Sequence, residues 1–431
     1  MPQGSDRRPL AAALRSSVAD ELTEAPVRPV GVDQCDTIAV FVENLDFGNH
    51  QRALIRLANK LHDLGHPVQV VSSASGPLAA TLRDGIGRVR LRPGNTLVGR
   101  WMALRAHPSA ARHLLGPLVV SPRPPYALRL LGPLADYLSA ARPAALICGS
   151  ANLNVIAVLA KRLAGVSTGV IVTERSTAHG RASYRALLRQ TYLDADAIVA
   201  ASAHVARSMV EGLQIPPERV RCIFDPAVPD DVQQLVRAPS PHRWFDIDQP
   251  PVVLSAGDPN CTEDFALLVR AFARLRKERL VRLVLLSTAP VSGGYDALRE
   301  LATELRVAPD FETLEFPSNP FAFFARAGVF VSSKTPERVG NLAAETLACG
   351  CPVVGARTEP SVEVLDNGRY GRLVPGGDVG ALANALAEAL QVPRDSTAFA
   401  ARAAEYGEER AARAYSALCA ELGASTKMLR S

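Results

Sequence analysis

Two glutamates, Glu337 and Glu345, lie eight positions apart in a stretch that also carries Lys334 and Arg338. A pair of carboxylates at this spacing can frame one ligand from two sides, and neighbouring cations can neutralise an anionic group on it. For an isolated pair of glutamates, two solvent-exposed carboxylates are the default expectation. The elements around the pair therefore decide between a ligand site and an ordinary surface.

These elements favour a ligand site. Residues 329–331 are an apolar run typical of a short buried strand, and a polar loop, 332–338, follows it. Residues 342–349 are good helix formers that end at Gly350, so Glu345 lies within a predicted helix. In a doubly wound sheet, ligands bind in the loops after the carboxyl ends of strands. A helix N-terminus facing such a loop favours phosphate, because it presents free N–H groups and a positive dipole end.

The stretch 337–354, ERVGNLAAETLACGCPVV, resembles the E-x7-E region of retaining GT-B glycosyltransferases of the family 4 type, in register and in composition. The resemblance implies that Glu337 is the catalytic glutamate that contacts the donor sugar. It implies that Glu345 holds the ribose hydroxyls of the nucleotide. It also implies a set of donor-binding positions around them: Gly340, Asn341, Leu342, Gly257, Lys334 and Arg338.

The resemblance covers most of the chain, from about residue 37 to residue 390. The first strand, loop and helix look like the family's start, with Gly48-Asn49 in place of a double glycine. Residues 366–375, DNGRYGRLVP, match a family motif closely. The implied acceptor-side loop residues are Gly48, Asn49 and Ser150.

The fold class implied is α/β, GT-B, with two Rossmann-like domains facing each other across a cleft. Two series of alternating strand and helix patterns in the sequence agree with this expectation. We predict a flexible tail at 1–36, an acceptor-side domain at 37–237, a linker at 238–251, a nucleotide-sugar domain at 252–395 and a C-terminal helix at 396–431 that returns to the first domain.

The stretch expected to hold the donor diphosphate departs from the family pattern. The family has an arginine and a lysine there, whereas this chain has Asp258 and Glu263. One charge pair near 4 Å contributes up to about 4 kcal/mol at an effective dielectric constant near 20, so reversing two pairs should cost several kcal/mol. A helix N-terminus contributes up to about 2 kcal/mol and does not offset that alone. The two carboxylates could instead hold Mg²⁺, but the fold rarely needs a metal, and we expect none.

Other departures point the same way. Residues 150–152 lack the histidine that the family often has near the scissile bond, and a Thr-Glu-His motif ends in Arg175 here. The loop that faces the sugar, 358–361, lacks its glycine. An active transferase with replacement cations and a non-catalytic homologue, retained as partner or scaffold of an active transferase, both remain open. A GT-B epimerase or phosphorylase fits the E-x7-E region less well.

Residues 88–129 are rich in arginine and proline and include Trp101 and Tyr126. One interpretation is a solvated helical face with loops. The other is a basic, partly apolar lip that touches anionic lipid or a lipid-linked acceptor. The sequence alone leaves both interpretations open.

Composition narrows the function classes. The formal net charge is +5, which does not require a nucleic-acid partner. Aromatic residues make up only 5%, which argues against a stacking platform for single-stranded nucleic acid. The seven cysteines are scattered, which indicates reduced thiols in a reducing compartment. No run of eighteen apolar residues occurs, and residues 1–36 lack the apolar region of a secretory signal. We expect a cytoplasmic protein, with weak peripheral contact at the inner face of the membrane as an option.

The leading hypothesis is a transferase that moves a hexose from a UDP- or GDP-linked sugar to a glycan or lipid-linked acceptor, with retention of configuration. Its context would be polysaccharide or glycoconjugate biosynthesis. The expected partners are the nucleotide sugar and the acceptor, with a second glycosyltransferase as a further option and no nucleic acid. No cofactor is expected beyond the donor itself.

Overall fold

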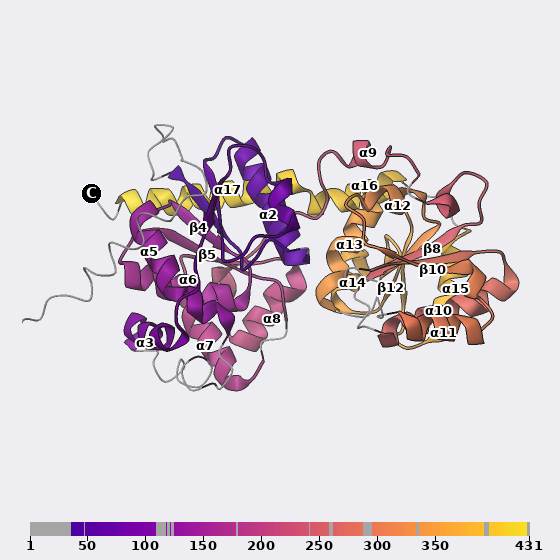
Figure 1. Cartoon of the computed structure of the whole chain (residues 1–431), viewed down its shortest axis with the longest axis horizontal. Helices are drawn as coiled ribbons and strands as arrows, with labels where there is room; N and C mark the ends of the chain where they lie inside the picture. Colours follow the sequence, from indigo (N-terminus) through magenta and orange to yellow (C-terminus); the bar gives the residue numbers. More distant parts are fainter. Residues whose placement is uncertain are drawn as a thin grey trace, which may run out of the picture.

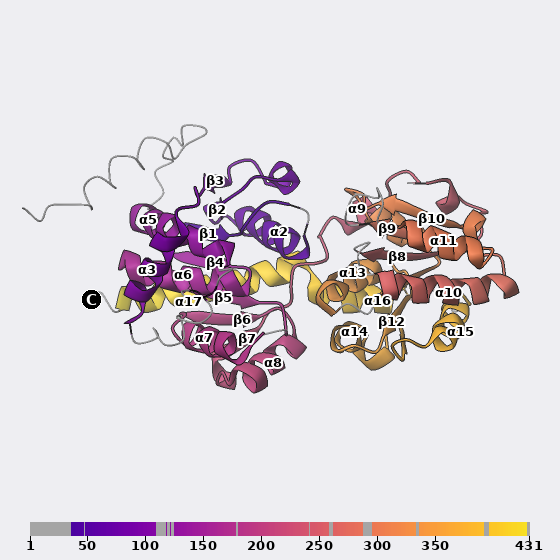
Figure 2. The same cartoon turned by 60° about the horizontal axis from the view of Figure 1, so that its bottom comes forward.

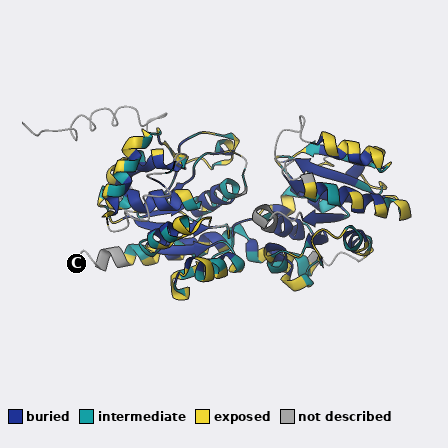
Figure 3. Ribbon diagram, turned by 90° about the horizontal axis from the view of Figure 1, so that it is seen from below, coloured by how far each residue is buried: buried dark blue, intermediate teal, exposed yellow. Residues whose placement is uncertain are grey.

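The computed structural model describes residues 36–428, apart from residues 47, 109–117, 119–120, 122–124, 178–179, 241, 258–261, 288–294, 333–335 and 392–395. The chain forms two lobes, each built on a parallel sheet with helices on both faces (Figure 1). In each lobe the buried residues concentrate in the strands and on the inner faces of the helices (Figure 3). None of the described helices combines the length and apolar character needed to cross a membrane.

The first sheet has the described strand order β3-β2-β1-β4-β5-β6-β7, and all neighbours are parallel. Its strands are β1 (Ile38–Phe41), β2 (Val68–Ser72), β3 (Gly87–Arg90), β4 (Ala145–Cys148), β5 (Gly169–Glu174), β6 (Ala197–Ala200) and β7 (Val220–Cys222). Every residue of β1, β4, β5 and β6 is buried, as expected of parallel strands covered on both faces. The strand order reverses between β1 and β4, and doubly wound sheets bind ligands at the carboxyl ends that flank such a point.

Helices cover both faces of this sheet. On one face, α2 (Asn49–Asp63) packs beside α17 (Glu408–Met428), and Leu57 of α2 and Leu418 of α17 share one core. The other face is covered by α3 (Thr96–Ala106), α5 (Leu131–Ala141), α6 (Ala151–Ala164), α7 (Ala182–Leu193) and α8 (Ala203–Leu213).

The second sheet has the described strand order β10-β9-β8-β11-β12-β13, again with parallel neighbours. Its strands are β8 (Val252–Gly257), β9 (Arg282–Ser287), β10 (Phe311–Glu315), β11 (Val329–Ser332), β12 (Val353–Ala356) and β13 (Arg372–Val374). The order reverses between β8 and β11. We call this reversal, like the one between β1 and β4, the switch point of its sheet.

The helices of the second lobe also lie on both faces of their sheet. One core contains residues of α10 (Thr262–Glu278), α11 (Asp296–Glu304) and α15 (Val379–Ala389). The opposite core contains residues of α12 (Phe321–Arg326), α13 (Pro336–Ala348), α14 (Glu359–Val364) and α16 (Ser396–Ala403), and α9 (Val232–Leu235) adds a short helix there. The two Rossmann-like lobes together form the GT-B arrangement.

The chain passes between the lobes twice. After β7 it enters the core of the second lobe through residues such as Ala227 and Val228. Residues 238–251, where we predicted a linker, include the 3-10 helix η7 (Arg243–Phe245), and Trp244 and Phe245 are buried in the same core. That stretch is packed against the second lobe, because burial of two aromatic side chains outweighs its proline content.

The return passage runs through the C-terminal helices. α16 packs on α13 in the second lobe, and α17 then lies against α2, β4 and β5 of the first lobe (Figures 1 and 2). The domain boundaries themselves stay predictions.

Candidate functional site

α13 brings the predicted donor residues to the carboxyl edge of the second sheet, directly after β11. Glu337, Arg338 and Gly340 lie in its first turns, where the structure describes the backbone only, and Lys334 lies outside the described residues. The sequence pattern predicted a loop at Glu337, but the helix already begins at Pro336. The fixed φ of proline suits the first helical position, which explains the earlier start.

The earlier start of α13 moves the free N–H groups of the helix. They belong to the first turn, around residue 337, and not to residues 341–343, where we predicted the start of the helix. Leu342 is buried in the core of the second lobe, and Asn341 is half-buried. Their N–H groups are expected to bond within the helix.

Glu345 faces the first lobe. Its side chain is 2% exposed, and its Oε1 accepts hydrogen bonds from Arg52 Nη2 at 2.9 Å and from Arg56 Nη1 at 3.0 Å. Both arginines belong to α2. The second carboxylate oxygen, Oε2, is buried and has no hydrogen-bond partner within the described residues. The Glu345 carboxylate therefore lies where the two lobes meet, and one of its two oxygens, Oε2, can still accept hydrogen bonds.

The amphipathic pattern of α2 explains how the arginines reach Glu345. Its apolar residues, such as Leu54 and Leu61, face the sheet, while Arg52, Arg56 and Lys60 recur at intervals of four on another side. We call these three residues the basic ridge of α2. Beyond the contact with Glu345, the ridge meets acids outside the first sheet, because Lys60 bonds to Asp230 of the crossover segment and lies 2.8 Å from Glu409 of α17.

The environment of the ridge is partly apolar. The Arg52 guanidinium lies 5.5 Å from the centre of the Phe316 ring and that of Arg56 lies 5.9 Å from the Phe321 ring. Burial lowers the pKa of Arg56, and the charge of Glu345 opposes that shift. Arg56 also donates to the carbonyl of Ala227 in the crossover segment.

The predicted acceptor-side residues gather at the switch point of the first sheet. Gly48 is the N-cap of α2, after β1, and Asn49 is the first residue of that helix. Ser150 is the N-cap of α6, after β4. Since β1 and β4 are neighbours, these residues share one edge of the sheet.

The switch point of the second sheet carries the predicted donor residues. Gly257 ends β8, and α13 follows β11, which is the neighbour of β8. Gly257 packs closely, because a Cβ there would lie 2.7 Å from the Phe265 ring. Each lobe thus presents its predicted residues at the place where its strand order reverses, which is the arrangement expected of two facing nucleotide-binding folds.

Two family models match the chain side by side: Glycosyltransferase Family 4 over residues 50–227 and Glycosyl transferases group 1 over residues 250–392. The chain belongs to the GT-B glycosyltransferases. Among curated proteins, this glycosyltransferase is similar to N-acetylgalactosamine-N,N'-diacetylbacillosaminyl-diphospho-undecaprenol 4-alpha-N-acetylgalactosaminyltransferase of Campylobacter jejuni, with 26% identity over 51% of this chain and 60% of the relative. It is also similar to the lipopolysaccharide core biosynthesis glycosyltransferase LpsE of Rhizobium meliloti, with 33% identity over 37% of this chain and 44% of the relative. The match therefore spans 60% or less of the length of these curated relatives.

Solved structures show the same fold. A glycosyltransferase of Rickettsia africae superposes with a TM-score of 0.72 at 16% identity, over 90% of this chain and 98% of that one. HepE of Anabaena, solved in complex with UDP, superposes with a TM-score of 0.68 at 15% identity, over 90% of this chain and 100% of that one. At these identities the likeness concerns the fold alone.

Of the two carboxylates at the family's cation positions, Asp258 and Glu263, the structure describes only Glu263. Asp258 lies outside the described residues. Glu263 is exposed in the first turn of α10, where a carboxylate stabilises the positive end of the helix dipole. In the part of the chain that the structure describes, no group of three His, Cys, Asp or Glu residues could hold a metal ion.

Arg175, which ends the Thr-Glu-His-like motif, ties parts of the glycosyltransferase together. Its Nε donates to both oxygens of Asp225 at 2.9 and 3.0 Å, and its Nη1 donates to the carbonyl of Gly149 at 3.2 Å. The charge of Asp225 raises the pKa of Arg175 despite the opposing effect of burial. The arginine thus fixes the crossover segment to the end of β4.

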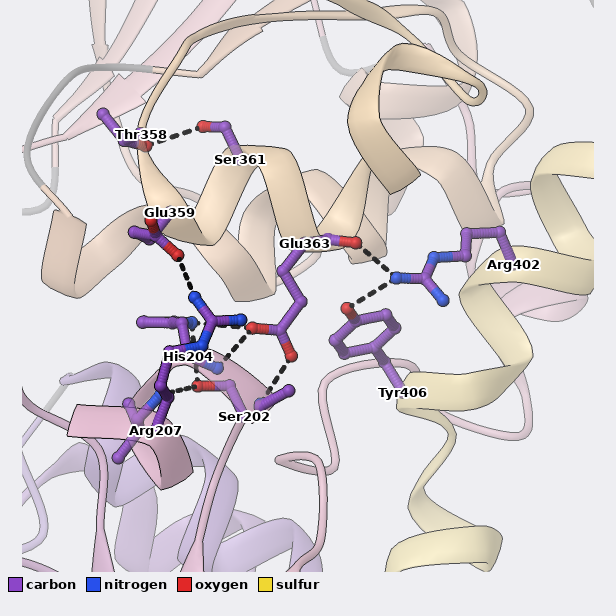
Figure 4. Close-up of polar contacts among 11 residues, drawn as sticks. Ser202, His204, Arg207, Thr358, Glu359, Ser361, Glu363, Arg402 and Tyr406 are labelled. Atoms are coloured by element: carbon purple, nitrogen blue, oxygen red, sulfur yellow. Dashed lines mark hydrogen bonds and ion pairs between the residues drawn. The ribbon is translucent and has the colours of Figure 1, made fainter. Parts of the chain in front are cut away.

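A second contact between the lobes joins α14 to α8 (Figure 4). The Glu363 carboxylate accepts hydrogen bonds from the N–H groups of Ala203 and His204, at 2.7 and 3.0 Å, and lies 2.7 Å from His204 Nδ1. It therefore caps the N-terminus of α8 from the other lobe. Arg207 pairs with Glu359 at 3.1 Å beside it. The sequence predicted a sugar-facing loop at 358–361, but α14 already begins at Glu359, because Pro360 suits the first turn of a helix. The acids of this helix bind the first lobe.

Sequence reasoning missed Arg52 and Arg56 as members of the site. The signal that could have found them is the basic ridge, since three cations at intervals of four opposite an apolar face are visible in the sequence. The identity of their partner, Glu345, depends on how the two lobes meet.

Proposed function

We propose that this glycosyltransferase transfers a hexose from a UDP- or GDP-linked sugar to a glycan or lipid-linked acceptor, with retention, in polysaccharide or glycoconjugate biosynthesis. The observation that carries the proposal is the buried Glu345, which lies on α13 at the second switch point and faces the first lobe. Its unpaired Oε2 is an acceptor suited to the hydroxyls of a ribose.

The proposed roles follow from position. Glu337, at the start of α13, is proposed to contact the donor sugar as the catalytic residue, and the free N–H groups of the same turn are proposed to bind an anionic part of the donor. Gly257, Lys334, Arg338, Gly340, Asn341 and Leu342 remain proposed donor contacts. Gly48, Asn49 and Ser150, at the switch point of the first sheet, are proposed to bound the acceptor.

The relatives support the reaction class. HepE was solved with UDP and, in another structure, with UDP and glucose, which supports a nucleotide-sugar donor for this chain. The Campylobacter relative is named for a diphospho-undecaprenol acceptor, which supports a lipid-linked acceptor for this chain. Transfer leaves the donor's diphosphate with the nucleotide, so the site must stabilise about two negative charges.

The surface of the first lobe supports contact with anionic lipid. Four exposed apolar side chains lie on α3 and the adjoining 3-10 helix η5 (Tyr126–Leu130): Leu97, Val98, Trp101 and Tyr126. Arg105 and Arg129 stack on Trp101 and Tyr126. Residues 85–135 contain eight arginines and no Asp or Glu. Exposed apolar side chains beside arginines match an anionic membrane surface, where a lipid-linked acceptor would reside.

One titration tests the proposal. Purified protein is titrated with UDP, GDP and their hexose conjugates by isothermal calorimetry, and release of the nucleotide is measured with the tightest donor. An active transferase should bind one nucleotide sugar and release its nucleotide. Glu337→Gln should still bind that nucleotide sugar but should no longer release the nucleotide. If the nucleotide sugar binds but no nucleotide is released in the presence of acceptor glycans, the result favours a non-catalytic homologue. Asp258 and Glu263, which replace the family's cations, are the sequence feature that supports this alternative. Absence of binding to every nucleotide would refute both.

A further inference from the structure

The contact between α2 and Glu345 carries more positive than negative charge. Two guanidiniums converge on a single carboxylate oxygen, so one positive charge is left over. The side chains of Arg52 and Arg56 are 17% and 19% exposed, and little water is available to screen the excess. The charge of Glu408 also raises the pKa of Arg56, but its effect is smaller than that of Glu345. The next residue of the basic ridge differs, because Lys60 has two carboxylates, Asp230 and Glu409.

Glu345 itself indicates that the contact is incomplete without a ligand. Its Oε2 is buried and finds no hydrogen-bond donor among the described residues. A buried acceptor left unpaired costs about 1–3 kcal/mol. Bound hydroxyl donors would remove that cost, and they would bring the rest of the ligand against the two arginines.

The second lobe does not offer the cations that its family uses for the donor diphosphate, since Asp258 and Glu263 occupy those positions. We propose that Arg52 and Arg56 of the first lobe bind the diphosphate of the nucleotide donor in this chain. The inference rests on the proposed function and adds residues to it. Arg52 lies in the first turn of α2, which begins at Asn49, and the free N–H groups of such a turn are further donors for an anion.

The guanidinium group suits this role. Its planar set of N–H donors can hold a carboxylate with one edge and a phosphate with another. Arg52 uses Nη2 and Arg56 uses Nη1 for Glu345, which leaves the other N–H groups of each fork for the ligand. Because Glu345 is on the second lobe and the arginines are on the first, the donor would bind only when the lobes are together.

Calorimetric titration of the full chain with UDP, uridine, GDP and guanosine tests this inference. In Arg52→Gln, and again in Arg56→Gln, we expect the affinity for the nucleoside diphosphate to fall at least tenfold. The affinity for the matching nucleoside should change less than twofold, since it has no phosphate. Lys60→Gln is the matched control from the same ridge and should leave all affinities unchanged. Arg52→Lys, which keeps the charge and loses the fork, should fall between wild type and Arg52→Gln.

The outcomes separate the inference from the function on which it rests. Arg56 also holds the Ala227 carbonyl, so Arg52→Gln, with its melting temperature checked against wild type, is the decisive variant. Wild-type UDP affinity in Arg52→Gln, or equal losses for UDP and uridine, overturns the inference alone. Tighter UDP binding also overturns it and shows that the arginines compete with the donor for Glu345. A wild type that binds none of the four ligands refutes the proposed function and the inference together.

Discussion

Glu345→Gln should loosen the contact between the lobes without unfolding either of them. Glu345 is 2% exposed and holds two arginines that are more than four-fifths buried. Removing one partner of a buried ion pair costs about 3–5 kcal/mol. The glutamine amide still accepts one hydrogen bond and the arginines keep some water, so we expect about 2–3 kcal/mol. This free energy belongs to the closed arrangement, because Glu345 and the arginines lie on different lobes.

A change of that size shifts the ratio of closed to open molecules roughly 30- to 150-fold. Small-angle X-ray scattering of the full chain without ligand measures it as an increase in the radius of gyration. Glu359→Gln is the matched control: it makes the same chemical change in another pair between the lobes, but Glu359 and Arg207 are 68% and 59% exposed. An exposed pair contributes at most about 1 kcal/mol, so the control should scatter like wild type.

Two results would refute this reasoning. Scattering of Glu345→Gln that is indistinguishable from wild type means that the Glu345 contact does not hold the lobes together. Equal expansion in both variants means that burial does not set the strength of these pairs.

Three further predictions concern charge. Asp258→Arg combined with Glu263→Lys should tighten UDP binding at least tenfold, about 1.4 kcal/mol, by calorimetry; unchanged binding would mean that neither position faces the phosphates. The protein should float with anionic liposomes at low salt and leave them at high salt, and Trp101→Glu should weaken flotation; no flotation at low salt leaves a solvated face. Burial opposes ionisation of Glu363, but hydrogen bonds from His204 and from the N-terminus of α8 outweigh it and lower its pKa. The contact is therefore fully formed above the usual glutamate range and weakens as the pH falls below about 4.5, so acid expansion seen by scattering should be smaller in Glu363→Gln.

The fold was predictable because its signals are local. Buried parallel strands are continuous apolar runs, so the short strand predicted at 329–331 is observed as β11, Val329–Ser332. The resemblance in the E-x7-E region predicted a GT-B glycosyltransferase, which the family models confirm, and the solved structures share its fold. The start of α13 was placed too late, because the polar residues before Asn341 obscured the helix signal of Pro336.

The membership of the site was not predictable to the same extent, because it depends on contacts remote in sequence. Arg52 and Glu345 are 293 positions apart, and nothing local to either residue names the other. The packing of Trp244 and Phe245 onto the second lobe was also not predictable from local sequence. The prolines around them indicated a linker, whereas the burial of the two aromatic side chains depends on contacts with the rest of the lobe. The roles of Glu337, Lys334 and Arg338 stay predictions.

The basic ridge of α2 shows that one helix can use one side to pack on its own sheet and another side to make contacts beyond that sheet. The helix needs only its apolar side to fold onto the first sheet, so Arg52, Arg56 and Lys60 are not required for that packing. Their partners all lie beyond the first sheet: Glu345 in α13, Asp230 in the crossover segment and Glu409 at the start of α17. Lys60 meets two carboxylates and is neutralised, whereas Arg52 and Arg56 share one. The charge left over thus sits at the end of the ridge nearest the two switch points, where an anionic donor would complete the pairing.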